Sequence, residues 1–103
     1  MEILTQENIS EFRKNEKHII YATAIWCGPC RMLSPIMDKV SEKYPEVNIG
    51  KMDVEQNSEV TSELGIRNIP TILFIKNGEI VDRQMGAVEQ SKIEEKLNNF
   101  LNN

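Results

Sequence analysis

Two cysteines separated by two residues are the feature of this sequence best suited to chemistry. They lie in the run Trp26-Cys27-Gly28-Pro29-Cys30, which follows an apolar segment and opens a segment with helical periodicity. Residues at i and i+3 on a helix are neighbours, so the two sulfurs can form a disulfide without a large backbone movement. At a helix N-terminus, free amide N–H groups and the helix dipole stabilise a thiolate, the nucleophilic form of cysteine. We therefore predict thiol–disulfide exchange, with Cys27 as the activated thiol.

The residues around Cys27 suit the same chemistry. Cys30 lies one turn further along the helix, where we expect it to be more shielded than Cys27. Pro29 suits the first helical turn because it lacks an N–H that would be unpaired there. Gly28 leaves space beside Cys27 for a substrate, and we expect Trp26 to be a partly exposed substrate contact.

Two other interpretations of the cysteine pair are weaker. A structural zinc site needs four ligands, usually Cys or His, and only His18 could be added to the pair. A pair of inert buried cysteines is the second interpretation, but a helix N-terminus and a Gly-Pro insert do not favour it. We therefore expect redox chemistry and no metal site.

Composition excludes several other classes of protein. The 103 residues are 40% hydrophobic and 27% charged, so we expect one globular domain over residues 1–103. The net charge of -4 and the lack of a basic cluster argue against a nucleic-acid partner. No apolar run approaches the ~20 residues of a membrane helix, and no signal peptide is recognisable at the N-terminus. We therefore expect a cytoplasmic protein that does not bind a membrane.

Hydrophobic patterning predicts strands that alternate with helices, followed by a hairpin. The expected strands cover residues 2–4, 18–25, 47–54, 71–76 and 79–85. The expected helices cover 5–15, 27–44, a short segment that Asn57 or Ser58 caps and Gly65 ends, and 91–101. Asn77-Gly78 is the strongest hairpin signal, because a type I′ turn needs two residues that tolerate positive φ. Pro35 predicts a kink in the long helix. The alternation implies parallel strand pairs, and the hairpin makes the sheet mixed.

Further motifs extend the pattern over the whole chain. After Trp26 to Cys30 come Arg31-Met32, Pro35, Gly65-Ile66-Arg67, Ile69-Pro70-Thr71, Lys76-Asn77-Gly78-Glu79 and Gly86-Ala87. With these motifs in this order and spacing, the chain resembles the thioredoxin family. A C-x-x-C pair near a βαβ pattern is a general indicator of that family, and Ile-Pro-Thr about forty residues later makes the indication specific.

The resemblance implies an α/β protein with the thioredoxin fold, in which four helices flank a five-stranded mixed sheet of order 1-3-2-4-5. It also implies that the Ile69–Pro70 peptide bond is cis and faces Cys27. A substrate strand would pair with the backbone at Ile69. The docking surface would be a flat apolar patch around an exposed sulfur, made of Trp26, Gly28, Pro29, Ile69, Pro70, Gly86 and Ala87.

The resemblance further implies a two-step reduction of disulfides in target proteins. Cys27 attacks the target to give a mixed disulfide, and Cys30 resolves it and leaves Cys27–Cys30 oxidised. A thioredoxin reductase, a flavoprotein that uses NADPH, would restore the dithiol, so the chain would be an electron carrier in cell redox homeostasis. The sequence has no G-x-G-x-x-G motif, so we expect no bound cofactor and only indirect use of NADPH. A monomer is the expected state.

One position departs from the family pattern. Most thioredoxins carry a buried Asp five residues before the motif tryptophan, whereas this chain has Tyr21. A phenol is a poor base at neutral pH, so we hypothesise that water or the leaving thiolate takes the Cys30 proton and alters the pH dependence. Lys51 matches the lysine that lies beside this Asp in the family. It fits equally well as an ordinary lysine on a strand, with its aliphatic stem buried and its charge in the solvent. Thr23 stands where the family often has a second tryptophan.

Two other functions are compatible with the same fold. The first is an oxidant or isomerase for folding proteins, which the Gly-Pro insert and the unrecognised signal peptide disfavour. The second is a binding module of a larger complex, which would keep its activity after replacement of both cysteines by serine.

Overall fold

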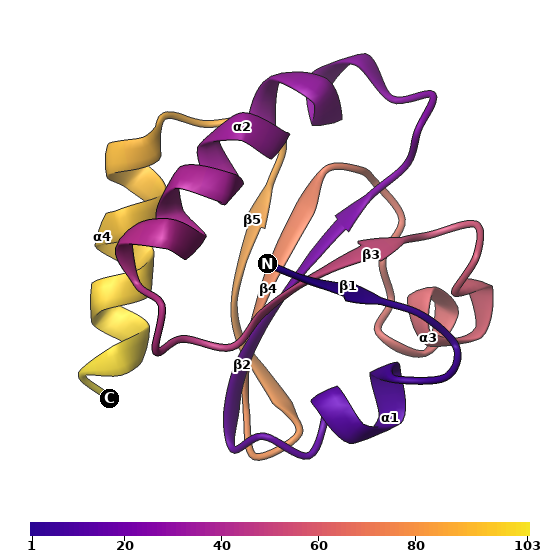
Figure 1. Cartoon of the computed structure of the whole chain (residues 1–103), viewed down its shortest axis with the longest axis horizontal. Coiled ribbons are helices and arrows are strands. Elements are labelled where there is room, and N and C mark those ends of the chain that lie inside the picture. Colours follow the sequence, from indigo (N-terminus) through magenta and orange to yellow (C-terminus); the bar gives the residue numbers. More distant parts are fainter.

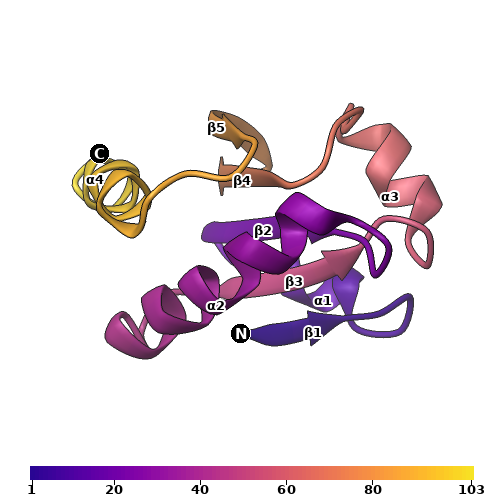
Figure 2. The ribbon, with the colours of Figure 1, turned by 90° about the horizontal axis from the view of Figure 1, so that it is seen from above.

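Five strands and four helices make up the computed structural model, which describes residues 1–103. In chain order they are β1 (Glu2–Leu4), α1 (Ile9–Phe12), β2 (Lys17–Thr23), α2 (Gly28–Lys43), β3 (Ile49–Asp53), α3 (Ser58–Glu63), β4 (Thr71–Lys76), β5 (Glu79–Met85) and α4 (Gln90–Leu101). The sheet order is β1-β3-β2-β4-β5, with β1, β3 and β2 parallel and the β2–β4 and β4–β5 pairs antiparallel. Helices α2 and α4 cover one face, and α1 and α3 cover the other (Figure 1, Figure 2). The predicted fold and strand order are confirmed.

The predicted element boundaries hold best for the hairpin and worst for the first helix. Strands β4 and β5 match their predicted ranges, whereas α1 is four residues long instead of covering 5–15. The reason is local: the Thr5 N–H donates to Asn8 Oδ1 at 2.7 Å, and Thr5 Oγ1 accepts the Glu7 and Asn8 N–H groups. Such side-chain bonds replace the first helical turn. Pro35 lies inside α2, and the kink expected there stays a prediction.

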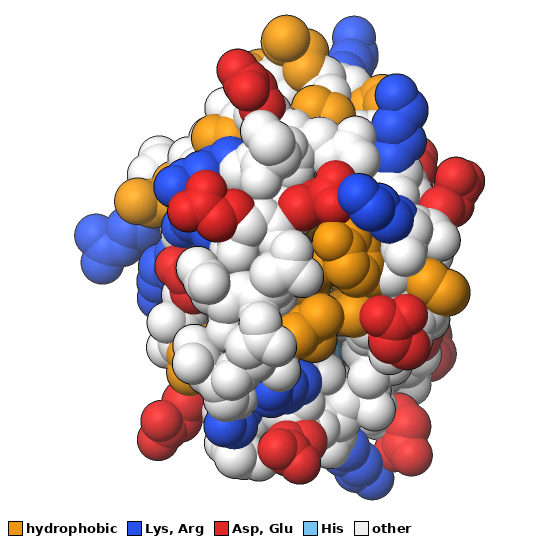
Figure 3. Space-filling view, turned by 90° about the vertical axis from the view of Figure 1, so that its left-hand side faces the viewer, with side chains coloured by type: hydrophobic (Ala, Val, Ile, Leu, Met, Phe, Trp, Pro, Cys, Tyr) orange, Lys and Arg blue, Asp and Glu red, His pale blue; other side chains and the backbone are white.

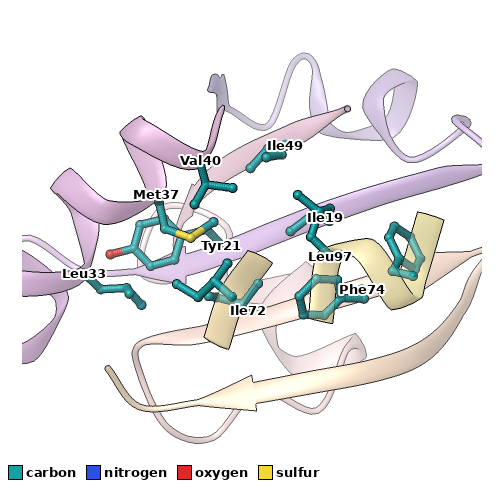
Figure 4. Packing of buried hydrophobic residues seen from close by; sticks show 11 residues of the cluster. Ile19, Tyr21, Leu33, Met37, Val40, Ile49, Ile72, Phe74 and Leu97 are labelled. Atoms are coloured by element: carbon teal, nitrogen blue, oxygen red, sulfur yellow. The ribbon is translucent and has the colours of Figure 1, made fainter. Parts of the chain in front are cut away.

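The core consists of two layers, one on each face of the central strands. Alternation along β2 sends Ile19 and Tyr21 toward α2 and α4, and Ile20 and Ala22 toward α1 and α3. All four of these residues are at most 2% exposed, so β2 is buried on both faces as predicted. Figure 4 shows the first layer, where Tyr21 lies beneath α2 close to Met37. The strand that leads to the cysteines is therefore held from both sides.

Turn chemistry fixes two connections near β4. Asn77 and Gly78 have φ angles of 52° and 80°, which is the positive-φ pair expected of the hairpin between β4 and β5. The Ile69–Pro70 peptide bond at the start of β4 is cis, as predicted. The Gly86 N–H, just after β5, donates to the Pro70 carbonyl at 2.8 Å. The end of the hairpin is therefore tied to the loop that carries Pro70.

Helices α2 and α4 are joined by a polar cluster at the C-terminal end of α2. Lys43 Nζ lies 2.7 Å from Glu94 Oε1, and the Tyr44 hydroxyl donates to the same oxygen at 2.9 Å. The hydrogen bond from Lys43, followed by those from Gln90 and Tyr44, lowers the pKa of Glu94. On this face, cationic and anionic side chains are interspersed, and hydrophobic side chains appear at the end where α2 begins (Figure 3). The polar cluster around Glu94 and the cysteine pair therefore lie at opposite ends of α2.

None of the helices combines the length and the apolar character needed to cross a membrane.

His18, the only histidine, is buried at the start of β2. Its Nδ1–H donates to the Asn15 carbonyl at 3.0 Å, and its ring packs edge-on against Phe12 with centroids 5.3 Å apart. Nε2 has no hydrogen-bond partner. Burial lowers the pKa of His18. The hydrogen bond to the Asn15 carbonyl opposes this shift, and the charge on Arg13 adds to it. The folded state therefore holds this ring in its neutral form.

We expect acidification below about pH 6.5 to destabilise the fold through His18. The folded pKa lies below the unfolded value, so the unfolded chain binds the proton first. Stability is complete above the unfolded pKa and declines as pH falls toward the folded pKa. Urea unfolding between pH 8 and pH 5 measures this slope, with His18→Phe as the non-titrating comparison. Equal pH slopes in the two proteins would contradict the assignment.

Candidate active site

The cysteine pair lies where β2 gives way to α2, at the end of the molecule shown uppermost in Figure 1. Cys27 is the N-cap of α2, with extended backbone angles (φ -87°, ψ 113°), and Cys30 lies in the first turn. The two residues form a disulfide with a Cα–Cα distance of 5.3 Å. The Cys30 N–H donates to Cys27 Sγ at 3.2 Å. Cys27 therefore occupies the place at the helix N-terminus where a side chain accepts an otherwise unpaired amide hydrogen.

Both cysteines are shielded in this disulfide form. Cys27 is 4% exposed and Cys30 is 1% exposed, so the order of shielding is as predicted but the difference is small. The expectation of an openly exposed Cys27 is wrong for the disulfide form, because Ala24, Val54 and Ile69 pack around the pair. Gly28 and Pro29, by contrast, are exposed beside it.

Exposed apolar side chains stand next to the disulfide. Trp26 is 65% exposed, in agreement with the prediction that it is more than a core residue. Its Nε1–H donates to Glu55 Oε1 at 2.6 Å, which fixes the direction of the indole. Ile25 and Met32 are 77% and 72% exposed and extend the apolar surface. Sequence reasoning missed Ile25 and Glu55: the first looked like the end of a buried strand, and no spacing rule links position 55 to Trp26.

Four of the predicted docking residues follow position 68, and one of them, Ile69, lies against the disulfide. Ile69 packs against the cluster that contains Cys27 and Cys30. Pro70 is buried, and its carbonyl accepts the Gly86 N–H, which places residue 86 beside this loop. Ala87 is exposed and follows directly after Gly86. Ile69, about forty positions from the cysteines along the chain, therefore lies against them.

Tyr21 is fully buried beneath the first turns of α2, and its hydroxyl forms a hydrogen bond with the helix backbone. The hydroxyl donates to the Cys30 carbonyl oxygen at 3.0 Å and is 2.9 Å from Ser34 Oγ. No hydrogen bond joins it to a sulfur. Tyr21 therefore positions the segment that carries Cys30, and Ser34, which the sequence reasoning missed, is its partner.

Lys51 lies on β3 directly opposite Tyr21, on the α2 face of the sheet. It is half-buried and takes part in none of the four ion pairs of the chain. Together with Cys30 and Ser34 it lines a cavity between the sheet and α2. Lys51 is therefore a cation in the same cavity wall as Cys30, without an ion-pair partner.

No group of three or more His, Cys, Asp or Glu side chains is arranged to hold a metal ion.

Comparison with known proteins agrees with this geometry. A sequence profile of the family described as Thioredoxin matches residues 1–99. A thioredoxin of Porphyra purpurea is 43% identical over 79 residues, which are 76% of this chain and 74% of that protein. A thioredoxin of Haemophilus influenzae is 41% identical over 80 residues, 77% of this chain and 71% of that protein.

A solved structure is similar over nearly the whole chain. It comes from work on the structural basis of the thiol resolving mechanism in yeast mitochondrial 1-Cys peroxiredoxin via glutathione/thioredoxin systems. The TM-score is 0.82 at 28% identity, and the alignment covers 96% of this chain and 94% of that one.

Removal of the Tyr21 hydroxyl tests its positioning role. We expect Tyr21→Phe to lower the free energy of unfolding by about 0.5–1.5 kcal/mol, the net contribution of a typical buried hydrogen bond. Ser34→Ala is the matched change, since it removes the other hydroxyl of the pair. Urea unfolding of both single variants and the double variant measures the coupling. Strictly additive effects would contradict a shared hydrogen bond.

Proposed function

This chain belongs to the thioredoxin family, and we propose that it reduces disulfides in other proteins with Cys27 as nucleophile and Cys30 as resolving thiol. It is a thiol–disulfide oxidoreductase whose targets contain disulfides. The observation that supports the division of roles is the hydrogen bond from the Cys30 N–H to Cys27 Sγ at the start of α2. That bond favours negative charge on Cys27 rather than on Cys30.

The proposed reaction transfers two electrons in two exchanges. The Cys27 thiolate attacks one sulfur of the target disulfide, and the other target sulfur leaves as a thiolate that takes up a proton. The Cys30 thiol then loses its proton and attacks Cys27 Sγ, which breaks the mixed disulfide and releases the second target thiolate. The Cys27–Cys30 disulfide seen in the structure is the product of that second step. Water is the proton acceptor that we propose for Cys30, because the Tyr21 hydroxyl is bonded to the helix backbone.

The regeneration step is part of the proposal. A thioredoxin reductase, which is a flavoprotein, would return the disulfide to the dithiol with electrons from NADPH, so this chain would use NADPH only indirectly and carry electrons between proteins. We place the protein in the cytoplasm as a monomer, with residues 1–103 as one domain. The two-layer core shared by all nine elements supports the single domain.

Target proteins would dock on the surface around the disulfide. Trp26, Ile69, Pro70, Gly86 and Ala87 are the proposed contacts, with Gly28 and Pro29 leaving room beside Cys27. Tyr21 and Lys51 support the site from beneath α2. An exposed apolar surface of this kind suits partners that share a disulfide rather than a sequence.

Trapping of the intermediate tests the roles of the two cysteines. We expect Cys30→Ser to accumulate a mixed disulfide with a disulfide-containing protein, because the second exchange is blocked. Cys27→Ser should accumulate none with protein targets. The double serine variant is the control, and full activity of that variant in its native setting would favour a binding module instead. Equal trapping by both single variants would contradict the division of roles.

The direction of electron flow depends on the reduction potential of the pair. Thioredoxin has a reduction potential of about -270 mV, and folding oxidants have values of about -180 to -120 mV. We expect the value for this pair to lie near that of thioredoxin. The Gly-Pro insert between the cysteines favours the reductant. Equilibration with a defined dithiol–disulfide buffer, followed by counting of alkylated thiols, measures the potential. A value in the oxidant range would overturn the reductase and leave the exchange chemistry intact.

A further inference from the structure

Five methionines occur in the chain, and the fold separates them by exposure. Met32 and Met85 are 72% and 61% exposed. Met37 and Met52 are 1% and 0% exposed, and Met1 is half-buried against the core layer below α2. An oxidant dissolved in water therefore meets two methionine side chains on the folded protein, whereas Met37 and Met52 are reached only when the structure opens.

Met32 lies on the exposed side of α2, next to the residues beside Cys27. Residues three and four apart on a helix are neighbours, so Met32 follows Pro29 and Gly28 along one face of α2. Both of these residues are exposed. Cys30, two positions before Met32, is turned about 200° away around the helix and is 1% exposed. Met32 therefore extends the surface on which we propose that targets dock.

Met85 is the last residue of β5 and adjoins the loop that carries Pro70. It stands directly opposite Thr71, the first residue of β4, and side chains opposite each other in an antiparallel pair share one face of the sheet. Gly86, the next residue, donates its N–H to the Pro70 carbonyl at 2.8 Å. Ile69, just before Pro70, packs against the disulfide. Met85 therefore borders the second part of the proposed docking surface.

In the disulfide form, the accessible sulfur-containing side chains at this end of the molecule are methionines rather than cysteines. Cys27 and Cys30 are 4% and 1% exposed and are bonded to each other, so neither offers a free thiol to an oxidant. Met32 and Met85 have no such protection. We therefore expect these two methionines to be oxidised while the cysteine pair stays unchanged.

Oxidation would change the property that makes these side chains suitable for docking. A methionine suits a surface that binds varied partners, because it is flexible, apolar and polarisable. Its sulfoxide is polar, and a sulfoxide oxygen buried against an apolar partner loses its hydrogen bonds with water. That loss weakens the docking of a protein target. Exchange with a small disulfide buries far less of this surface, so oxidation affects it less.

We propose that Met32 and Met85 are oxidation sites through which hydrogen peroxide weakens the docking of protein targets. Each thioether sulfur takes one oxygen atom from the peroxide and is oxidised by two electrons, and water is the reduced product. The Cys27–Cys30 disulfide takes no part in this step. The inference rests on the proposed function in one respect, that protein targets dock on the surface around the disulfide.

The order of oxidation tests the two sites. The disulfide form is treated with hydrogen peroxide, the reaction is stopped with catalase, and peptide mass spectrometry follows the uptake of oxygen at each methionine. We expect Met32 and Met85 to be oxidised about tenfold faster than Met37 and Met52, which the core shields. The protein unfolded in urea is the control, and there we expect equal rates. Equal rates in the folded protein would overturn the proposal.

The effect on docking is measured with two substrates, insulin and the small disulfide dithiobis-nitrobenzoate. The peroxide-treated chain is reduced, freed of reductant and mixed with each substrate in a single turnover. We expect treatment to lower the second-order rate constant for insulin about fivefold and to leave the rate constant for the small disulfide unchanged. A loss of equal size with both substrates would contradict docking as the affected step.

Substitutions locate the effect at the two methionines. In the Met32→Leu/Met85→Leu variant, apolar side chains of similar volume remain but cannot be oxidised, so we expect the treated and untreated forms of this variant to reduce insulin at the same rate. Met37→Leu is the matched control, because it removes a buried methionine and leaves the exposed pair. It should lose as much rate on treatment as the original chain. An effect of peroxide that persists in the Met32→Leu/Met85→Leu variant would overturn the proposal.

A second variant reproduces the polar surface without any oxidant. Met32→Gln/Met85→Gln places polar side chains at both positions, and we expect it to reduce insulin about fivefold more slowly than Met32→Leu/Met85→Leu. Equal rates for these two variants would contradict a role of the two positions in docking.

The untreated chain separates this inference from the proposed function. An untreated chain that reduces no protein disulfide would overturn the proposed function. An untreated chain that reduces insulin, and keeps the same rate after oxidation of both methionines, would overturn this inference and leave the proposed function standing.

Discussion

The hydrogen bond from the Cys30 N–H to Cys27 Sγ expresses the constraint on which the site depends, the unpaired amide groups at the start of a helix. A helix cannot satisfy its first N–H groups internally, and α2 is the helix of this chain in which the side chain at the N-cap accepts one of them. The N-cap residue of α2 is Cys27, and its sulfur accepts the hydrogen bond from the helix. The same bond that begins α2 therefore also prepares Cys27 to carry negative charge. In the proposed mechanism, helix formation and activation of the Cys27 thiol depend on one interaction.

That interaction is useful only because the helix start is fixed in space. Strand β2 is buried on both faces and delivers the chain to residue 27 from a rigid position. Tyr21 then reaches from the same strand to the Cys30 carbonyl, and Ser34 shares its hydroxyl. The far end of α2 is held to α4 by Lys43 and Glu94. Both ends of the helix are thus tied to the fold, so the cysteine pair cannot shift without loss of packing or hydrogen bonds.

The two sides of the disulfide have different physical characters. On one side, the exposed Trp26 and the half-buried Ile69 present apolar surface close to Cys27. On the other side, behind Cys30, a small cavity carries Lys51 and Arg31. The difference arises because Tyr21 fills the interface under α2 while Thr23 does not reach across it. One helix turn therefore separates an apolar surface from a small cavity that two cationic side chains line.

The sequence by itself determined several features that depend on local spacing. Rules that act within a few residues place Cys27 and Cys30 one helical turn apart, Asn77-Gly78 at the hairpin turn, and β4 and β5 on either side of it. The short α1 escaped those rules because Thr5 and Asn8 compete for backbone groups with the helix. The tertiary structure alone decided that Glu55 orients Trp26, that Tyr21 bonds Ser34 and the Cys30 carbonyl, and that a cavity opens above Thr23. These features depend on which side chains meet when β2, β3 and α2 pack, and spacing along the chain carries no measure of that fit.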